Sequence, residues 1–410
     1  MGIKLGLVGL GMFGSQFAKL FKSHPLVDKI ALCDCEAAKV KKFLEDPFMA
    51  GKVNARDCYE TLDDLCKSDV DAVVVITQPW LHAPQCLQVL NAGKHVYSAV
   101  PLISLPDDAE VLDWGCRIAE AVKRSGRQYM LGETTVYRPQ TMLCARLAAE
   151  GRFGEFVYAE GEYVHDLDNP GCNLRRVQEG RTTGKVGEQH EALMAPYRAR
   201  GLKSTPMNYP THSISGPIHV MKTRALSVSA IGTPNTNHDP FFADYDRSNI
   251  AAFYRLANGA SLRICEFREV AARSFDILNS ETFRIFGKNG SFTRNHTFLH
   301  NRNIPGEEVV WQEQDYTDAE MRDKLPPEVE RAFRKLYDPN ANDDDFQTDF
   351  QPQGHGGSHP YLVHNFVKMV AENGPSPIPI EEALHYMAMG VAASRSARKD
   401  GETIPVEQFD

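Results

Sequence analysis

The sequence predicts an α/β fold for its first third, with a parallel sheet, and an α+β fold with an open, largely antiparallel sheet for the rest. Up to about residue 132, short apolar strand candidates alternate with helical segments; beyond it, strand candidates follow one another with turn signals between them. A chain of 410 residues is also too long for one ordinary core. We therefore expect two domains, residues 1–132 and 133–410, and the final helices can pack back on the first.

The elements of the first domain follow from its apolar runs. Strands are expected at residues 4–9, 29–34, 72–77, 95–98 and 128–131, and helices at 13–21, 80–92 and 107–124. Gly93 is placed to end the helix at 80–92. This order of strands and helices indicates a doubly wound parallel sheet.

The second domain begins with a predicted helix at residues 138–150. Strands are expected at 155–163, 225–231, 251–255, 260–266 and 283–286, and helices at 361–372 and 380–399. Asn258-Gly259 and Asn289-Gly290 are hairpin turn signals. Residues 169–208 and 305–353 show little periodicity; we expect loops there, and a solvated loop at 169–208 rather than a lid.

Composition narrows the class of protein. The formal net charge of −9 argues against nucleic acid or an anionic membrane as the main partner. No apolar run reaches the roughly 18 residues of a membrane helix, and no signal-peptide pattern opens the chain. The nine cysteines are scattered without a Cys-x-x-Cys pair, which favours reduced thiols in a cytoplasm over disulfides or a zinc site, so we expect no metal.

A glycine-rich loop directly follows the first predicted strand. Residues 9–14 read Gly-Leu-Gly-Met-Phe-Gly and open a helix, which is the pattern of a dinucleotide-binding Rossmann unit. Gly9 allows a tight turn, Gly11 lets a pyrophosphate approach the backbone, and Gly14 lets the helix pack close to the sheet. Met12 and Phe13 lie at the helix N-terminus, whose free N–H groups attract phosphates.

An acidic residue completes this pattern. Asp34 ends the next predicted strand, 20 residues after Gly14. Its carboxylate can accept hydrogen bonds from the ribose hydroxyls and would repel a 2′-phosphate, although Lys39 and Lys41 lie near. The predicted cofactor is therefore NAD rather than NADP.

Several further motifs resemble the Gfo/Idh/MocA family of NAD(P)-dependent sugar and cyclitol oxidoreductases. They are Thr-Gln-Pro-Trp-Leu-His at residues 77–82, Gly-Lys-His-Val-Tyr at 93–97, and Phe-Arg-Ile-Phe-Gly-Lys-Asn-Gly-Ser at 283–291. The resemblance implies cofactor contacts from the loops at the carboxyl ends of the strands, namely Thr77, Pro79, His82, Ala99, Pro101 and Glu133. It also implies an open sheet that often mediates oligomers, and hence a homodimer or homotetramer.

One departure from the family pattern bears on the chemistry. The Glu-Lys-Pro signature is Ala99-Val100-Pro101 here, and the family lysine helps to position the substrate hydroxyl. Val100 has no titratable group, while oxidation of a carbinol requires that some group accept the hydroxyl proton. Another residue must accept it, or the chain is not a catalyst.

Residues 208–217, Asn-Tyr-Pro-Thr-His-Ser-Ile-Ser-Gly-Pro, supply a candidate. This form and Gly-His-Gly-Gly-Ser at 354–358 resemble a divergent branch of the family that includes NAD-dependent α-N-acetylgalactosaminidases. The resemblance implies redox-neutral cleavage: a sugar carbinol is oxidised, the aglycone is eliminated, water adds, and the sugar is reduced again.

The candidate catalytic residues are His212, Tyr209 and His355. Imidazole exchanges protons near neutral pH, and a tyrosine can donate a proton. Tyr209 and His212 are expected just before a helix with Ser213 or Ser215 as its N-cap, and a buried structural histidine is the alternative. For His355, between glycines, a flexible loop without function is an equal alternative.

Candidate substrate-binding residues flank the first strand of the second domain. Arg138 follows the last strand of the first domain, and Tyr163, His165 and Asp166 end a predicted strand. Three functional hypotheses remain: redox-neutral cleavage of a glycoside, a net sugar or cyclitol dehydrogenase or epimerase, and a non-catalytic NAD-bound sensor. In each case the expected small-molecule partner is a carbohydrate.

Overall fold

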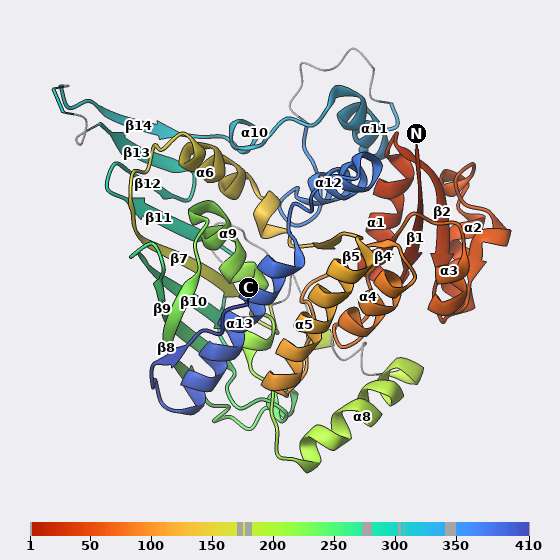
Figure 1. Cartoon of the computed structure of the whole chain (residues 1–410), viewed down its shortest axis with the longest axis horizontal. Helices are drawn as coiled ribbons and strands as arrows, with labels where there is room; N and C mark the ends of the chain where they lie inside the picture. The colour runs from red at the N-terminus through yellow and green to blue at the C-terminus, as the bar shows by residue number, and fades with distance from the viewer. Residues whose placement is uncertain are drawn as a thin grey trace. The chain divides into compact units, whose positions relative to one another are not determined.

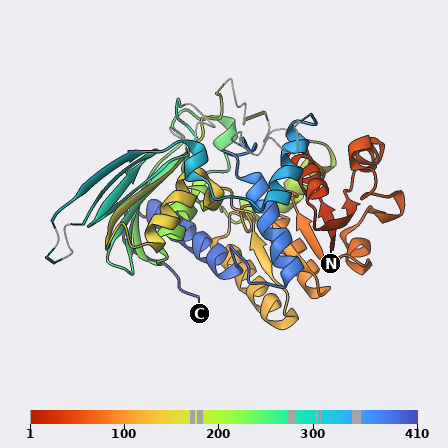
Figure 2. The same ribbon diagram turned by 90° about the horizontal axis from the view of Figure 1, so that it is seen from above.

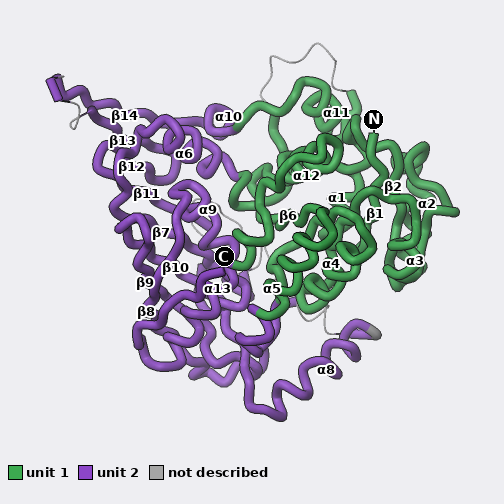
Figure 3. Tube along the Cα trace, in the orientation of Figure 1, with its two compact units in different colours: residues 1–103, 113–137, 323–384 green, residues 104–112, 138–322, 385–410 purple. Residues whose placement is uncertain are grey.

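The chain forms two compact units in the computed structural model, which describes residues 2–169, 175–176, 183–272, 281–301, 305–306, 308–340 and 350–409. The first unit contains residues 1–103, 113–137 and 323–384, and the second contains 104–112, 138–322 and 385–410 (Figure 3). Apart from residues 104–112, the chain passes into the second unit between Tyr137 and Arg138, where a boundary after residue 132 was expected. Residues 323–384 return to the first unit, a larger part of the chain than the sequence indicated.

The first unit is built on a six-stranded parallel sheet in the order β3-β2-β1-β4-β5-β6 (Figure 1). Its strands are β1 Ile3–Val8, β2 Val27–Cys33, β3 Cys58–Tyr59, β4 Ala72–Val75, β5 His95–Ser98 and β6 Tyr129–Leu131. Four of the five predicted strands consist almost wholly of buried residues, as in a sheet covered on both faces. All five are confirmed, whereas the two-residue strand β3 was not predicted.

The helices of this unit connect the strands or pack beside the first helix. They are α1 Met12–Ser23, α2 Ala37–Glu45, α3 Leu62–Lys67, α4 His82–Asn91, most of α5 Asp108–Ser125, α11 Pro327–Tyr337 and α12 His359–Glu372, with 3-10 turns at Pro47–Met49, Ala55–Asp57 and Thr135–Tyr137. Helix α1 packs against α11 and α12 with buried Phe17 and Phe21. Gly93 follows α4 with a φ of 73°, which confirms it as the residue that ends the helix.

The second unit contains a nine-stranded sheet in the order β14-β13-β12-β11-β7-β10-β9-β8-β15. Its strands are β7 Phe156–Val164, β8 Ala225–Thr233, β9 Asn249–Leu256, β10 Ser261–Phe267, β11 Phe283–Gly287, β12 Gly290–Thr293, β13 His296–His300, β14 Trp311–Asp315 and β15 Ile404–Pro405. β7 and β10 pair in parallel and the other neighbours pair antiparallel, so the expected largely antiparallel sheet is confirmed.

Several helices and 3-10 turns belong to the second unit. The helices are α6 Pro139–Ala149, α8 Gly184–Ala199, α9 Thr211–Met221, α10 Asp318–Met321 and most of α13 Ile380–Arg398, with 3-10 turns at Pro206–Asn208 and Pro240–Phe242. Helix α9 packs on β7, β10 and β11, and α6 packs on α9 (Figure 2). A Cβ atom on Gly161 of β7 would lie 1.9 Å from the carbonyl oxygen of Ser213, so only glycine permits this close approach of helix and strand.

Two expectations about loops are wrong. Within 169–208 the chain forms α8, and within 305–353 it forms β14, α10 and α11. Helix α8 escaped the sequence analysis because its apolar residues do not gather on one face and because Pro196 lies inside it. Residues 170–174, 177–182, 302–304, 307 and 341–349 lie outside the described part of the chain. Among the described helices, none combines the length and the apolar character needed to cross a membrane.

Candidate active site

The glycine loop of the first unit has the geometry of a phosphate-binding turn. Gly9 has a φ of 92°, and a Cβ on it would lie 2.1 Å from the carbonyl oxygen of Ile76. A Cβ on Gly14 would lie 2.0 Å from the carbonyl oxygen of Gly9, whereas one on Gly11 would meet nothing within 4 Å. Gly11 is the N-cap of α1 and offers no side chain to its free N–H groups, so the space above it fits a pyrophosphate.

Asp34 lies beside this turn at the end of β2. Its carboxylate is buried and accepts hydrogen bonds from the backbone N–H of Leu10 at 2.7 Å and of Glu36 at 2.9 Å. The Nζ atom of Lys39 lies 4.0 Å from Oδ1 of Asp34 and 2.6 Å from Oε1 of Glu36. Each carboxylate oxygen can accept a second hydrogen bond, so Asp34 fits a ribose diol as well as holding the turn.

The other predicted cofactor contacts lie on loops at the carboxyl ends of β4, β5 and β6. His82 is buried, with Nδ1 2.8 Å from the carbonyl oxygen of Pro101 and Nε2 3.3 Å from that of Thr77, so its ring joins two of these loops. The Val100–Pro101 bond is cis. Glu133 is fully buried and accepts a hydrogen bond from the N–H of Thr135 at 2.8 Å. Ala99 is buried, and Pro79 is half-buried.

His355 belongs to the first unit and lies next to the phosphate-binding helix. Its ring meets that of Phe13 edge to face at 5.5 Å, and its Nδ1 lies 2.9 Å from Nε2 of His359. His355 has a φ of 44°, and a Cβ on Gly354 would lie 2.1 Å from the His359 ring. The glycines of this loop therefore let two imidazoles approach each other and Phe13.

The candidate substrate residues gather in the second unit around Tyr163, near the end of β7. The ring of Tyr163 stacks on His165 at 4.0 Å, lies 4.9 Å from the ring of His212, and stacks with Tyr209 at 6.4 Å. Tyr209 and His212 are 5.5 Å apart. Burial raises the pKa of Tyr163 well above its usual value, so its phenol stays protonated at neutral pH and can donate a hydrogen bond to a neighbour. The structure thus brings four predicted residues together.

On the β11 side of Tyr163 lies a buried carboxylate, Glu281. One oxygen lies 2.8 Å from Nε2 of His165, and the other pairs with Nη2 of Arg138, whose Nη1 donates to the Glu281 carbonyl oxygen at 3.3 Å. Burial opposes ionisation of Glu281, but the Arg138 charge and the His165 hydrogen bond hold its pKa well below the usual value. Burial lowers the pKa of His165, which leaves a neutral imidazole against a carboxylate.

On the β10 side lies a second buried carboxylate, Glu266, the register partner of Tyr163. It accepts hydrogen bonds from Nη2 of Arg268 at 2.7 Å and from Oγ of Ser213. The Arg268 guanidinium lies 4.4 Å from the centre of the Tyr163 ring. Burial outweighs these partners and raises the pKa of Glu266 to about 7.

The prediction that Ser213 or Ser215 caps the helix is wrong. Helix α9 begins at Thr211 with Pro210 as its N-cap, so both serines lie inside it and His212 lies in its first turn. The hydroxyl of Ser213 instead donates to Glu266 and to the Pro210 carbonyl oxygen at 3.1 Å.

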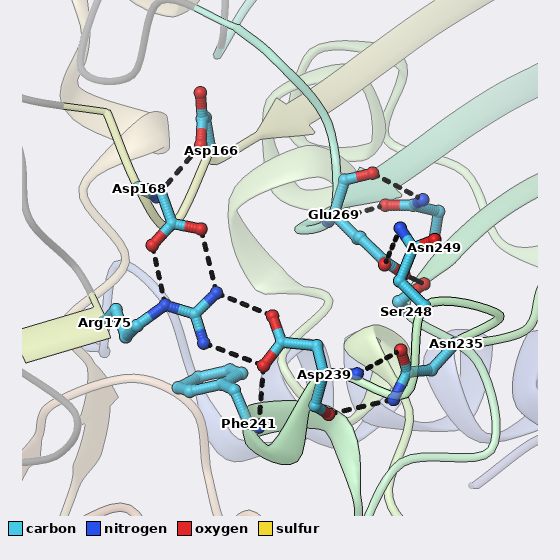
Figure 4. A network of polar contacts seen from close by, with 10 residues as sticks. Asp166, Asp168, Arg175, Asn235, Asp239, Phe241, Ser248, Asn249 and Glu269 are labelled. Atoms are coloured by element: carbon cyan, nitrogen blue, oxygen red, sulfur yellow. Dashed lines mark hydrogen bonds and ion pairs between the residues drawn. The ribbon is translucent and has the colours of Figure 1, made fainter.

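A polar network holds the loops that follow β7 and β10 (Figure 4). Asp166 accepts from the N–H of Asp168, and Arg175 bridges the carboxylates of Asp168 and Asp239 at 2.6 to 2.9 Å. The side chain of Asn249 accepts from the N–H groups of residues 268 and 269 at 2.8 and 3.0 Å. The guanidinium of Arg175 is therefore occupied by two aspartates. Arg181, another cation of this segment, lies outside the described residues.

Comparison with known proteins agrees with this geometry. Residues 3–133 match the family model described as "Oxidoreductase family, NAD-binding Rossmann fold", named GFO_IDH_MocA. The dinucleotide-binding domain belongs to the Gfo/Idh/MocA oxidoreductase family. It is accordingly an NAD-binding domain, and the turn at Gly9, Gly11 and Gly14 with Asp34 fits that cofactor.

Similarity to individual proteins extends further along the chain. A glycosyl hydrolase family 109 protein of Stenotrophomonas maltophilia is 23% identical over 99% of this chain and 89% of its own length. An alpha-N-acetylgalactosaminidase of Shewanella oneidensis is 26% identical over 40% of this chain and 36% of its own. A levoglucosan dehydrogenase structure in complex with NADH and levoglucosan has a TM-score of 0.70 at 16% identity and covers 100% of both chains, which shows a shared fold.

The sequence analysis missed three residues around Tyr163, namely Glu266, Arg268 and Glu281. A signal existed for Glu266, since Leu262, Ile264 and Glu266 alternate on one buried face of a predicted strand. A carboxylate in an apolar row marks a paired or functional site. Glu281 lies two residues before the buried Phe283 of β11 and carries the same signal more weakly.

Proposed function

We propose that the protein is an NAD-dependent enzyme that cleaves a glycoside without net oxidation or reduction. The observation that carries this proposal is the cluster of Tyr163, His165, Tyr209 and His212, which offers several proton-transfer groups on one face of the sheet. Similarity to a glycosyl hydrolase family 109 protein along nearly the whole chain supports it. So does Val100, which cannot serve as the proton acceptor of an ordinary family dehydrogenase.

Bound NAD would supply reversible acceptance of a hydride from a sugar carbinol. His212 would take the hydroxyl proton in the same step and pass it to solvent, which leaves a ketone and a neutral imidazole. A proton on the carbon next to a ketone is acidic enough for a side-chain base, and we assign its removal to His212, with Tyr209 as the neighbouring proton donor. The C1–aglycone bond then breaks as a C1–C2 double bond forms, and addition of water and return of the hydride complete the cycle. Tyr163, protonated and packed by His165 and Arg268, donates a hydrogen bond to a sugar oxygen.

Cofactor and substrate roles follow for the remaining residues. Phe13, Met12 and the three glycines would hold the pyrophosphate end of the cofactor, and Thr77, Pro79, His82, Ala99, Pro101 and Glu133 would contact the rest of it. Asp166 binds a sugar hydroxyl, whereas Arg138 acts by fixing Glu281 and so His165. We assign His355 to the cofactor turn through its contact with Phe13, and direct proton transfer by His355 is the alternative.

A net sugar dehydrogenase is the second candidate, favoured by the shared fold with levoglucosan dehydrogenase. A non-catalytic NAD-bound sensor is the third, since the family lysine is absent at Val100. The three candidates differ in what they release. Cleavage gives free aglycone with catalytic NAD, a dehydrogenase gives NADH in proportion to product, and a sensor gives neither.

The test incubates the protein with aryl glycosides and free sugars in deuterated water and follows aglycone, absorbance at 340 nm and deuterium at C2. We expect aglycone release without net NADH and with deuterium at C2 of the released sugar. His212→Ala should lower turnover by about 100-fold or more, and Tyr209→Phe should lower it less. His219→Gln, two turns further along α9, is the control and should leave turnover unchanged. Stoichiometric NADH, or released sugar without deuterium, would refute the proposal.

We also propose a homo-oligomer in the cytoplasm, with no nucleic-acid partner. The face of the nine-stranded sheet opposite α9 carries an aromatic row, Tyr158, Phe253 and Phe286, whose rings stack at 6.2 and 6.3 Å. Phe253 is 52% exposed, and Ile231 on the same sheet is 63% exposed. Apolar patches of this kind mark interfaces. Sedimentation that returns the mass of one chain would contradict an oligomer.

A further inference from the structure

The ion pair of Glu266 and Arg268 lies between two elements of the proposed site. In the register of β10 and β7, Glu266 stands opposite Tyr163, and Ile264 stands opposite Gly161, the glycine on which α9 rests. Glu266 is fully buried in the same row as Leu262 and Ile264. A charged residue therefore stands in an otherwise aliphatic row, next to the point where strand β7 and helix α9 meet.

The carboxylate of Glu266 connects to His212 through one residue. Its Oε1 accepts from Oγ of Ser213, the next residue after His212 in the first turn of α9. The same hydroxyl lies 3.1 Å from the carbonyl oxygen of Pro210, just before that turn. The carboxylate therefore ties the start of α9 to the end of β10 and limits how the turn that carries His212 can rotate.

Arg268 connects the same carboxylate to Tyr163. Its Nη2 donates to Glu266 Oε2 at 2.7 Å, and its Nη1 donates at 3.1 Å to the carbonyl oxygens of Tyr163 and Phe267. The guanidinium also lies 4.4 Å from the centre of the Tyr163 ring. Both the backbone and the ring of Tyr163 are thus fixed by the partner of Glu266.

We propose that Glu266 and Arg268 are a positioning pair, which holds His212 through Ser213 and holds Tyr163 directly in the geometry for proton transfer. This inference rests on the proposed function of the same site. A buried ion pair is a poor source of stability, because desolvation cancels much of its attraction, and an aliphatic pair would serve packing as well. Its two connections to the cluster give a reason for its presence.

The charge state of Glu266 gives the pair a measurable signature. Burial raises the pKa of Glu266 to about 7, against the attraction of Arg268 and the hydrogen bond of Ser213. The other titratable groups near it are His212 from α9, Tyr163 from β7, Tyr254 from β9 and Cys265, which precedes it on β10 and points to the other face. Ionised Glu266 accepts stronger hydrogen bonds from Arg268 and Ser213 than the protonated form does. We therefore expect His212 and Tyr163 to become fixed in position as pH rises through about 7.

The chain offers a matched control three residues further on. Glu269 also accepts from a serine hydroxyl, that of Ser248, within the network of Figure 4. Glu269→Gln and Glu266→Gln make the same chemical change to a serine-bound carboxylate. Glu269 lies in the loop beyond β10, and its carboxylate accepts from Asn237 and Ser248 rather than from the Tyr163 cluster, so it should not affect that cluster.

The experiment compares wild type, Glu266→Gln, Ser213→Ala and Glu269→Gln by kcat, KM and resonances of labelled Tyr163 between pH 5.5 and 8.5. For Glu266→Gln we expect kcat to fall about tenfold or more with KM within about twofold, and the rise of kcat through neutral pH to flatten. Ser213→Ala should lower kcat but keep that rise, and Glu269→Gln should match wild type. The Tyr163 resonances should show a pH inflection that Glu266→Gln shifts and Glu269→Gln keeps.

The outcomes separate this inference from the proposed function. Wild-type protein without cleavage of any glycoside refutes the proposed function, and the Tyr163 resonances then decide the positioning role alone. If Glu266→Gln leaves the pH inflection of the Tyr163 resonances unmoved, the pair does not position Tyr163 and the inference is overturned, whether or not the protein cleaves glycosides. Equal losses in Glu266→Gln and Glu269→Gln, together with equal falls in melting temperature, would assign both carboxylates to folding and also overturn it.

Discussion

Two buried carboxylates flank Tyr163, and their electrostatic behaviour is opposite. Glu281 and Glu266 each pair with an arginine on the helix-covered side of the same sheet. The pKa of Glu281 is held well below the usual range despite burial, because Arg138 and His165 both favour its charged form. The pKa of Glu266 is raised to about 7, because burial outweighs Arg268 and its other partner is the neutral hydroxyl of Ser213.

The difference teaches that residue type and depth do not decide the charge of a carboxylate. At Glu281 the charge of Arg138 and the His165 hydrogen bond outweigh burial, whereas at Glu266 burial outweighs Arg268 and Ser213. Titratable groups whose environments push their pKa values apart are a mark of sites that move protons. Glu281 is then a permanent anion that orients His165, and Glu266 is a group whose charge changes near neutral pH.

The largest expected effect comes from removing the cation on the Glu281 side. Arg138→Met leaves a buried anion with only His165 beside it, and breaking a buried pair in this way costs about 3 to 5 kcal/mol. Arg284→Met is the control, because the side chain of Arg284 is 43% exposed and Arg263 also binds its partner Glu160; about 0 to 1 kcal/mol is expected there. Urea unfolding at pH 7 measures both. A similar small loss in the two variants would contradict the permanent anion.

The second effect is the sign of the pH dependence of stability. Glu266 binds its proton more tightly in the folded chain, so the free energy of unfolding falls as pH rises from about 4.5 to about 7. The shift from 4.5 to about 7 corresponds to roughly 3 kcal/mol. Between pH 5 and 8 the wild type should therefore lose about that much more stability than Glu266→Gln.

Glu281 should show the reverse sign in the same measurement. Its pKa in the folded chain lies below the unfolded value, so its contribution is present at neutral pH and disappears as pH falls below about 4. Wild type should lose stability in acid more steeply than Glu281→Gln. Parallel pH curves for the two glutamine variants would show that the carboxylates behave alike, against the structure.

Much of the first unit could be predicted because its signals are local. The strand at His95–Ser98 and the turn after β1 follow from apolar runs and glycine spacing. Strands β12, β13 and β14 were not predicted, since short strands that carry many polar residues show no clear alternation, and all five residues of β14 are exposed. Their pairing depends on the neighbouring strands rather than on their own composition.

The residues of the candidate site likewise fall into two groups: those that a local pattern indicates and those whose partners come from distant parts of the chain. Tyr209 and His212 were accessible through the resemblance of residues 208–217 to a family motif, and Tyr163 and His165 through the predicted end of a strand. Glu281 and Arg138 lie 143 positions apart in the chain, so their pairing depends on tertiary contacts that no local pattern contains. The start of α9 was misplaced because Pro210 rather than a serine precedes its first turn.

The smallest expected effect comes from a substitution that should disturb the contacts of Glu266 and leave those of Glu281 intact. Gly161→Ala places a Cβ that would lie 1.9 Å from the Ser213 carbonyl oxygen, so the first turn of α9 must move off β7. Such overpacking costs about 1 to 3 kcal/mol. The moved turn weakens the contact of Ser213 with Glu266, whereas the contacts of Glu281 with Arg138 and His165 do not involve α9. The variant should therefore change how the free energy of unfolding varies between pH 5 and 8, and keep the wild-type dependence below pH 4.

Gly374→Ala, where a Cβ would meet nothing within 4 Å, is the control and should change neither pH dependence. A changed dependence below pH 4 in Gly161→Ala would mean that α9 supports both carboxylates, and the division of the site into a fixed side and a titrating side would be wrong.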